Sequence, residues 1–291
     1  MPEFERPPID KRQARAAFSR AADRYDEVAE LQREIAARML QRLSYIRHQP
    51  QRVLDVGSGT GEATLSLAKH YKKAQTIALD FAYPMLQRTR KRGSWLRRPR
   101  CVCGDAEQLP LASQSVDMIF SNAVLQWCND LPGTLREFLR VLRPNGMLLF
   151  STFGPGTLHE LRSSWSAVDG YSHVSPFLDM HDIGDAMVQA GWAEPVVDVD
   201  RIRVTYDDVA SLMRDLKTLG AHNVTDQRRR GLTGKGRMRA MIEAYESLRE
   251  DGKLPASYEV VYGHAWAPQQ RHENGVTLIP VEQLRSGGPV G

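Results

Sequence analysis

Long apolar runs and cysteines are what this 291-residue chain has least of. No stretch approaches the roughly 20 apolar residues of a membrane-spanning helix, and the N-terminus MPEFERPPIDKRQ lacks the apolar centre of a signal peptide. Only three cysteines are present, and the pair Cys101 and Cys103 has no second pair or histidine cluster at metal-ligand spacing. We therefore expect a soluble, cytoplasmic protein with no metal site, no disulfide framework and no membrane partner.

The composition is that of a globular protein with unevenly placed positive charge. With 42% hydrophobic and 25% charged residues, the chain can bury a full core. The formal charge is +4, and many of the basic residues fall in two clusters: Arg88, Arg90, Lys91, Arg92, Arg97, Arg98 and Arg100, and Arg228, Arg229, Arg230, Lys235, Arg237 and Arg239. Such runs are usually solvated faces, but two of them also fit an acidic partner, whether a protein, a nucleic acid or a small anion.

The first half of the chain alternates between strand and helix patterns. Apolar spacing predicts an amphipathic helix over 26–46. A β-branched run at 52–56 then leads into glycines and a helical pattern at 62–70. The same order recurs in strands at 76–80, 115–121 and 147–153 and helices at 84–92 and 132–142. This alternation predicts an α/β fold with a mostly parallel sheet and helices on both faces.

The second half departs from this period. Helices are expected at 157–167 and 181–190, and strands at 196–204 and 258–266. The fifty residues between those strands contain helical patterns at 207–219 and 235–250 and are too long for a plain connection. We predict N-terminal lid helices at 1–46, a core at 47–206 and 257–267 with an excursion at 154–180, a helical cap at 207–256 and a flexible tail at 268–291.

A glycine-rich turn follows the first expected strand, in Asp55-Val56-Gly57-Ser58-Gly59-Thr60-Gly61. Glycines there let a ligand approach the backbone and permit positive φ. A dinucleotide-binding fingerprint needs G-x-G-x-x-G, whereas Glu62 follows the third glycine here. The spacing therefore argues against NAD.

Polar residues follow the next strands in order. Asp80 ends the second strand, where a carboxylate can accept both hydroxyls of a ribose. Asp105 follows a third short strand, where it can accept from an adenine amino group, and 122–127 (Asn-Ala-Val-Leu-Gln-Trp) follows the fourth. Any one acid could equally be a helix cap or a surface charge. Together, these strand-end positions indicate a nucleotide-like ligand.

Two further segments complete the pattern: Gly104-Asp105-Ala106-Glu107-Gln108-Leu109-Pro110 and Leu142-Arg143-Pro144-Asn145-Gly146. Together, these motifs resemble the motif series of class I methyltransferases over about residues 50–155. The resemblance implies a Rossmann-like fold and S-adenosyl-L-methionine as the methyl donor, with S-adenosyl-L-homocysteine as product. The donor-binding residues it implies are Arg20, Asp55, Gly57, Ser58, Gly59, Gly61, Asp80, Phe81, Met85, Asp105, Ala106, Glu107, Asn122, Ala123, Gln126 and Trp127.

Other segments suggest the acceptor. Residues 17–25 (AFSRAADRY), 156–161 (GTLHEL) and 216–222 (LKTLGAH), with 122–127, resemble the malonyl-acyl-carrier-protein O-methyltransferases that open biotin synthesis. This resemblance extends to Trp266. It implies methylation of the free carboxyl of a malonyl thioester on acyl carrier protein.

Such chemistry needs no proton-transfer triad, because a carboxylate is already ionised at pH 7. We expect positioning residues instead. Tyr25 is predicted to lie beside the sulfonium, although simple core packing would also explain it. Arg20 either pairs with the donor's carboxylate or caps its helix. Lys217 or His222 holds the malonyl carboxylate, and His222 can equally be an ordinary polar neighbour.

Other functions share part of this pattern. A methyltransferase for a small free carboxylic acid would have the same donor motifs. A catalytically silent donor-binding scaffold would show a damaged turn or missing strand-end acids, and neither is present. The charge fits RNA, but the chain lacks an Asn/Asp-Pro-Pro-aromatic tetrapeptide and an appended RNA-binding module, so no nucleic-acid partner is expected.

Overall fold

A computed structural model of the chain describes residues 7–93, 98–221, 223, 233–269, 272–273 and 276–277. In this part of the chain a seven-stranded sheet has the order β3-β2-β1-β4-β5-β7-β6. Its strands are β1 (Arg52–Val56), β2 (Gln75–Asp80), β3 (Arg100–Cys103), β4 (Val116–Asn122), β5 (Leu142–Phe153), β6 (Ala193–Tyr206) and β7 (Leu254–Trp266). The pairs from β3 to β5 are parallel, and β7 pairs antiparallel with both β5 and β6. The predicted mostly parallel sheet is confirmed.

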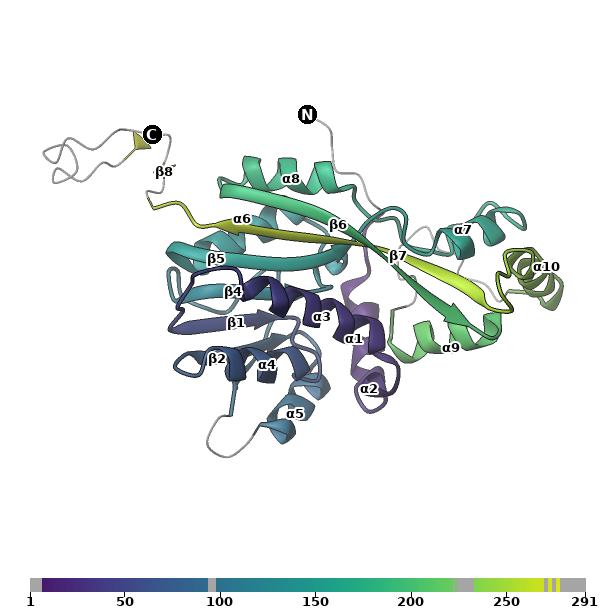
Figure 1. Cartoon of the computed structure of the whole chain (residues 1–291), viewed down its shortest axis with the longest axis horizontal. Helices are drawn as coiled ribbons and strands as arrows, with labels where there is room; N and C mark the ends of the chain where they lie inside the picture. The colour runs from purple at the N-terminus through teal and green to yellow at the C-terminus, as the bar shows by residue number, and fades with distance from the viewer. Residues whose placement is uncertain are drawn as a thin grey trace, which may run out of the picture.

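Helices cover both faces of this sheet (Figure 1). One apolar core lies between the sheet and α6 (Leu131–Val141) and α8 (Met180–Gln189). The opposite core contains α3 (Glu30–Leu43), α4 (Glu62–His70) and α7 (His159–Ser166). The central strand β1 is buried at four of its five residues, three of them apolar and the fourth Asp55, as expected of a strand in a doubly covered sheet.

The N-terminal helical region differs from the prediction. The single helix expected at 26–46 is wrong, because the chain breaks at Ala29 into α2 (Tyr25–Val28) and α3. Two contacts accompany the break: the Arg33 guanidinium of α3 donates a 2.9 Å hydrogen bond to the backbone carbonyl of Asp26 in α2. The Asp26 carboxylate accepts a 2.6 Å hydrogen bond from Oγ1 of Thr60, which lies outside both helices. These contacts fix α2 against the glycine-rich turn.

α1 (Lys11–Ala21) precedes this pair and packs on α5 (Tyr83–Arg92). The Asp10 carboxylate accepts the Gln13 backbone N–H at 3.0 Å and so caps the start of α1. A small apolar cluster joins the two helices, with Ala21 and Ala22 against Ala82 and Met85. The N-terminal segment is therefore fixed to the edge of the sheet that the motifs occupy.

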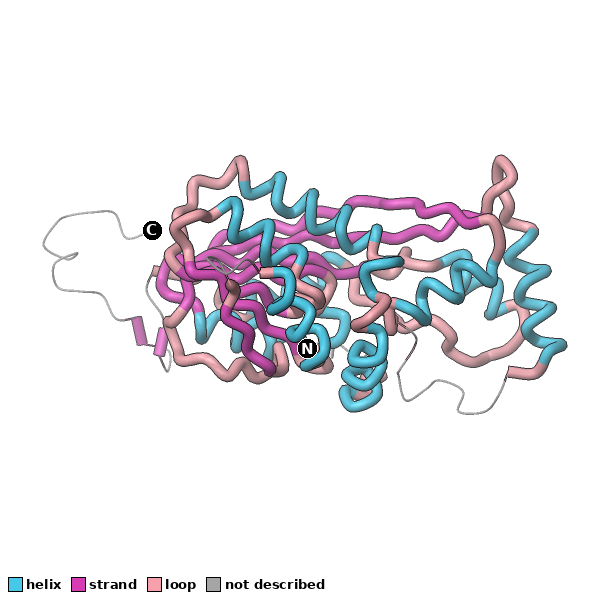
Figure 2. Tube along the Cα trace, turned by 90° about the horizontal axis from the view of Figure 1, so that it is seen from below, coloured by secondary structure: helices cyan, strands magenta, loops and turns pink. Residues whose placement is uncertain are grey.

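The strands β6 and β7 form a long antiparallel ribbon that runs past the parallel core (Figure 1). Its far end meets α7, α9 (Val209–Thr218) and α10 (Lys235–Glu246), as Figure 2 also shows. The helices expected at 207–219 and 235–250 are confirmed with shorter bounds, and their role as a cap stays a prediction. Most of the predicted tail lies outside the described residues, apart from the short pair β8 (His272–Glu273) and β9 (Val276–Thr277).

No described helix has both the length and the apolar character that crossing a membrane requires.

Candidate functional site

A pocket opens where the carboxyl ends of the parallel strands meet, and we call it the strand-end pocket. It lies beyond β1, β2 and β4 and beneath α1 and α2. Many of the predicted donor residues line it, first those of the turn and the second strand: Gly57, Gly59, Asp80, Phe81 and Met85. Those of the later strands are Asp105, Ala106, Asn122, Ala123 and Trp127. The structure thus brings together predicted residues from four separate segments.

The glycine-rich turn forms one wall of this pocket. Gly57 and Ser58 donate their backbone N–H groups to the Leu79 carbonyl at 2.7 and 2.9 Å, which binds the turn to β2. Gly57 has φ +70°, and a Cβ there would lie 2.1 Å from Val124 Cγ2. Gly59 has φ +53° and lies under the Tyr25 ring: a Cβ at Gly59 would lie 3.9 Å from Tyr25 Cε1. Side chains at these positions would close the space beside the turn.

Asp80 lies at the back of the pocket with both carboxylate oxygens engaged. One accepts the Gly59 N–H at 2.9 Å and the other the Ala82 N–H at 2.8 Å. Burial raises the pKa of Asp80 to about 6, although these two hydrogen bonds act against the rise. A carboxylate has about four acceptor sites, so capacity remains for hydroxyl donors from a ligand.

Asp105 lies at the other side of the pocket, next to a cation that the sequence did not suggest. Lys11 Nζ from α1 is 2.7 Å from Asp105 Oδ1 and 2.5 Å from Glu107 Oε2. Burial works to lower the pKa of Lys11, but the two carboxylates outweigh it and raise that pKa. Glu107 also accepts the Asp130 N–H and does not line the strand-end pocket, so its carboxylate is used to hold α1 in place.

A second pocket, the turn pocket, lies on the other side of the glycine-rich turn and shares Gly57, Gly59 and Asn122 with the first. Asp55 and Ser58 line it, as does Gln32 from α3. Asp55 is buried and accepts from Thr64 Oγ1, and burial raises its pKa to about 7. Within the described chain, Ser58 Oγ and Gln32 Oε1 are buried without a hydrogen-bond partner. Buried polar atoms of this kind need a partner, and a ligand would supply it.

A larger cavity of about 640 Å³ lies on the acceptor side, between the strand ends and α7, α9 and α10. It meets the strand-end pocket at Phe18, Tyr25 and Trp127, which line both. The Phe18 and Trp127 rings meet edge to face with centroids 5.1 Å apart. Aromatic faces attract cations, so this junction suits a positively charged reacting group.

Tyr25 is the first residue of α2 and lines both pockets and the large cavity. Burial is the main cause that raises the pKa of its hydroxyl, and the charges of Asp80 and Asp26 add to it. The hydroxyl therefore remains neutral at pH 7. The break in the helix at Ala29 is what places this side chain over Gly59.

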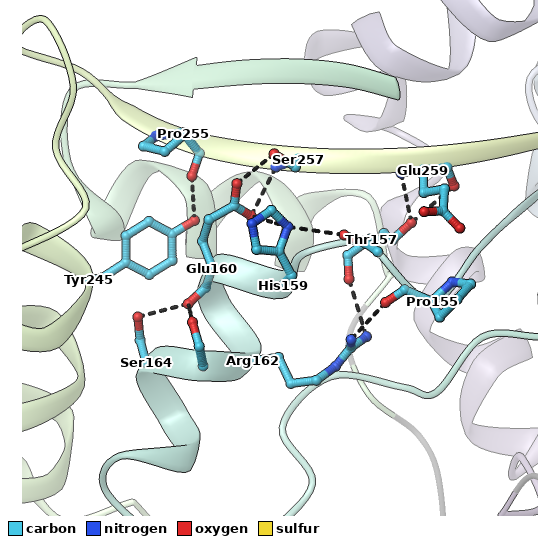
Figure 3. Close-up of polar contacts among 12 residues, drawn as sticks. Pro155, Thr157, His159, Glu160, Arg162, Ser164, Tyr245, Pro255, Ser257 and Glu259 are labelled. Carbon is cyan, nitrogen blue, oxygen red and sulfur yellow. Dashed lines mark hydrogen bonds and ion pairs between the residues drawn. The ribbon is translucent and has the colours of Figure 1, made fainter. Parts of the chain in front are cut away.

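One wall of the large cavity is a turn that β7 holds in place (Figure 3). Leu158 lines the cavity with φ +52°, a conformation that branched side chains rarely adopt. The Glu160 carboxylate accepts from the Ser257 N–H at 3.0 Å and from the Ser257 hydroxyl (Figure 3). The Leu158 N–H donates to the Ser257 carbonyl at 2.7 Å. Contacts of this number are needed to maintain a strained backbone.

The remaining predicted residues are spread more widely. Arg20, Gln126 and Lys217 line the large cavity, with Arg20 and Lys217 exposed and forming no ion pair among the described residues. Gly61 lines none of these spaces; it has φ +89° and its Cβ position lies 2.5 Å from Thr89 Cγ2, so it permits α4 and α5 to approach. His222 lies outside the described residues.

Sequence reasoning assigned no role to Lys11, Phe18 or Gln32. Phe18 and Gln32 each continue an otherwise ordinary helical pattern, and Lys11 belongs to a run of charges at the N-terminus. These three residues stand out only because they line the pockets beside the glycine-rich turn, and the tertiary structure brings them there.

Comparison with known proteins gives relatives over nearly the whole chain. Residues 54–150 match the family described as methyltransferase domain. A malonyl-acyl-carrier-protein O-methyltransferase of Gallionella capsiferriformans is 54% identical over 278 residues, covering 93% of this chain and 96% of the relative. One from Laribacter hongkongensis is 53% identical over 270 residues, covering 90% of this chain and 91% of the relative.

Solved structures show the same fold at low identity. The YcgJ protein of Bacillus subtilis has a TM-score of 0.57 at 17% identity, covering 81% of this chain and 99% of that one. A protein from Bacillus halodurans described as a putative methyltransferase has a TM-score of 0.56 at 16% identity, with 80% and 98% covered.

Proposed function

Because the chain belongs to the malonyl-acyl-carrier-protein O-methyltransferase family, we propose that it transfers a methyl group from S-adenosyl-L-methionine to the free carboxylate of a malonyl thioester on acyl carrier protein. The products are S-adenosyl-L-homocysteine and a malonyl methyl ester, which the family resemblance assigns to the start of biotin synthesis. The observation that carries the proposal is the aromatic junction of Phe18, Tyr25 and Trp127 between the strand-end pocket and the large cavity.

The residues of the two small pockets fit the methyl donor. Asp80 offers acceptor capacity for ribose hydroxyls, and Asp105 lines the side where we place the adenine. The unpartnered Gln32 Oε1 and Ser58 Oγ suit the amino-acid end, since an ammonium group donates up to three hydrogen bonds. When bound, the donor supplies an electrophilic methyl group on a sulfonium.

The protein's own contribution is positioning and exclusion of water. A malonyl carboxylate is ionised at pH 7 and needs no base. The neutral Tyr25 hydroxyl and the rings of Phe18 and Trp127 surround the junction where oxygen must meet the methyl carbon. Alignment and desolvation of this kind can lower a barrier by several kcal/mol, and by about 7 to 11 kcal/mol for well-oriented reactants.

The rate of methyl transfer is therefore expected to be flat from about pH 6 to 9 when the donor is saturating. The acceptor is fully ionised over that range, and the Tyr25 pKa lies well above it. Single-turnover measurements with malonyl-carrier protein test this. Asp55 of the turn pocket has a pKa raised to about 7, so the profile is also measured for Asp55→Asn. A one-proton rise through pH 7 to 8 that persists in this variant would show that the reaction uses a base or a different acceptor.

Tyr25→Ala is expected to lower kcat by about 10- to 30-fold, because a buried ring beside a cation contributes about 2 kcal/mol. Tyr25→Phe keeps the ring and should lose less than Tyr25→Ala. The matched control is Tyr45→Ala, since Tyr45 is 80% exposed beyond the end of α3. If Tyr25→Ala retained the wild-type kcat, Tyr25 would be a packing residue only.

The size of the large cavity favours a long acceptor over a small free acid. Its 640 Å³ falls in the range of pockets that hold drug-sized ligands, far more than a three-carbon diacid fills. Labelled S-adenosylmethionine should yield a base-labile methyl ester with malonyl-carrier protein. Labelling of free malonate in its place would favour a small-acid methyltransferase, and donor binding without any turnover would favour a scaffold.

A further inference from the structure

The large cavity contains a histidine that the chemistry above does not use. His173 lies in the loop after α7 and lines the cavity with Trp165 and Asn223. Its side chain is only 14% exposed. The other lining residues include the junction aromatics, so His173 faces the same space that the acceptor must enter.

Two neighbours fix the orientation of this ring. Trp165 stacks on it with centroids 3.7 Å apart and planes 6° from parallel, which covers one face. Asp169, 8% exposed, accepts from His173 Nε2 at 2.9 Å and from the Tyr171 N–H at 3.1 Å. Burial works to raise the pKa of Asp169, but these hydrogen bonds and the charge of Arg237 hold it below its usual value. Asp169 is thus ionised at neutral pH.

A carboxylate bound to one ring nitrogen keeps the proton on that nitrogen and leaves the other as an acceptor. In His173 the other nitrogen is Nδ1, which makes no hydrogen bond to the residues that the structure describes. A ring held this firmly on two sides resembles a built binding group more than a packing residue. Nδ1 is therefore available to accept a hydrogen bond from an N–H group of a ligand in the cavity.

We propose that His173 Nδ1 accepts a hydrogen bond from an amide N–H of the pantetheine arm that carries the malonyl group. This inference rests on the proposed function. The malonyl end must reach the junction at Tyr25, and the same cavity leads from there to His173. The N-terminal part of α10 lies on this side, since the charge of Arg237 acts on Asp169. His173 is therefore a positioning residue for the arm, remote from the reacting carboxylate.

The test compares two malonyl thioesters, malonyl-pantetheine, which has amides, and malonyl methyl thioester, which has none. His173→Gln keeps an amide group able to reach Asp169 but removes the acceptor at the Nδ1 position. We expect KM for malonyl-pantetheine to rise about tenfold, with KM for the methyl thioester changed less than twofold. His173→Asn places an amide oxygen near the Nδ1 position and should recover part of the loss.

Folding and donor binding are checked by the melting temperature and by calorimetry with S-adenosylhomocysteine, and both should match the wild type. Equal effects on the two thioesters, or no effect on either, would overturn the role of His173 while leaving the proposed function standing. Malonyl-carrier protein is assayed alongside: if the wild-type protein does not methylate it, the proposed function itself fails, and this inference with it.

Discussion

Asp80→Ala is expected to weaken S-adenosylhomocysteine binding by about 10- to 100-fold, measured by calorimetry. A hydrogen bond to a charged acceptor contributes about 1.5 to 3 kcal/mol. The substitution also removes the bonds to the Gly59 and Ala82 N–H groups that hold the turn. The affinity of the wild-type protein should also fall below about pH 6, because the raised pKa of Asp80 means that the carboxyl is protonated there and accepts less well.

The matched control is Asp117→Ala. Asp117 also accepts backbone N–H groups, from Gln51 and Arg52, and pairs with Arg143, but it lies near the start of β4, at the opposite end of the strands. Its loss should lower the melting temperature without changing donor affinity. Unchanged affinity in Asp80→Ala would remove Asp80 from the donor site.

The double variant Arg237→Glu and Arg239→Glu, which reverses two charges on α10, is expected to raise KM for malonyl-carrier protein about tenfold. Both residues are exposed near the start of α10, and the charge of Arg237 acts on Asp169 beside the large cavity. Acyl carrier proteins are acidic beside their pantetheine attachment, so basic residues here would steer them. The wild-type KM for malonyl-carrier protein should also increase with salt concentration, because screening over about 8 to 10 Å weakens the attraction between these basic residues and the acidic carrier protein.

The control comes from the other basic cluster, whose residues Arg88, Arg90, Lys91 and Arg92 lie on α5. Arg88 and Arg92 pair with Asp23 and Asp26 of the N-terminal region, which gives these two arginines a structural role. Arg90→Glu with Lys91→Glu changes the charge equally on a helix that does not line the large cavity. Malonyl-coenzyme A, which lacks the acidic helix, should be nearly insensitive to both doubles. Equal effects on both substrates, or no response to salt, would place the docking surface elsewhere. Arg228, Arg229 and Arg230, which belong to the predicted cluster of Arg237 and Arg239, lie outside the described residues.

Local sequence signals were sufficient for the parallel half of the fold. The β-branched run before Gly57 and the helical spacing after Gly61 predict strand, turn and helix because each depends on neighbours within a few residues. The position of Asp80 at a strand end then follows from strand order, since parallel strands end at one edge of the sheet. The excursion after Phe153 was also visible, as a loss of period, although β6 and β7 are longer than expected.

The acceptor side was decided by tertiary contacts. The helical pattern at 26–46 gives no sign of the break at Ala29, because one of the contacts that hold α2, from Thr60 to the Asp26 carboxylate, comes from outside the pattern. In the same way, His173 becomes a binding group only when Trp165 covers its face and Asp169 holds Nε2. Sequence by itself determined the donor motifs and their order, because these depend on backbone geometry within single turns. The junction, the large cavity and the ring at its wall depend on side chains that are distant along the chain, and only packing brings those together.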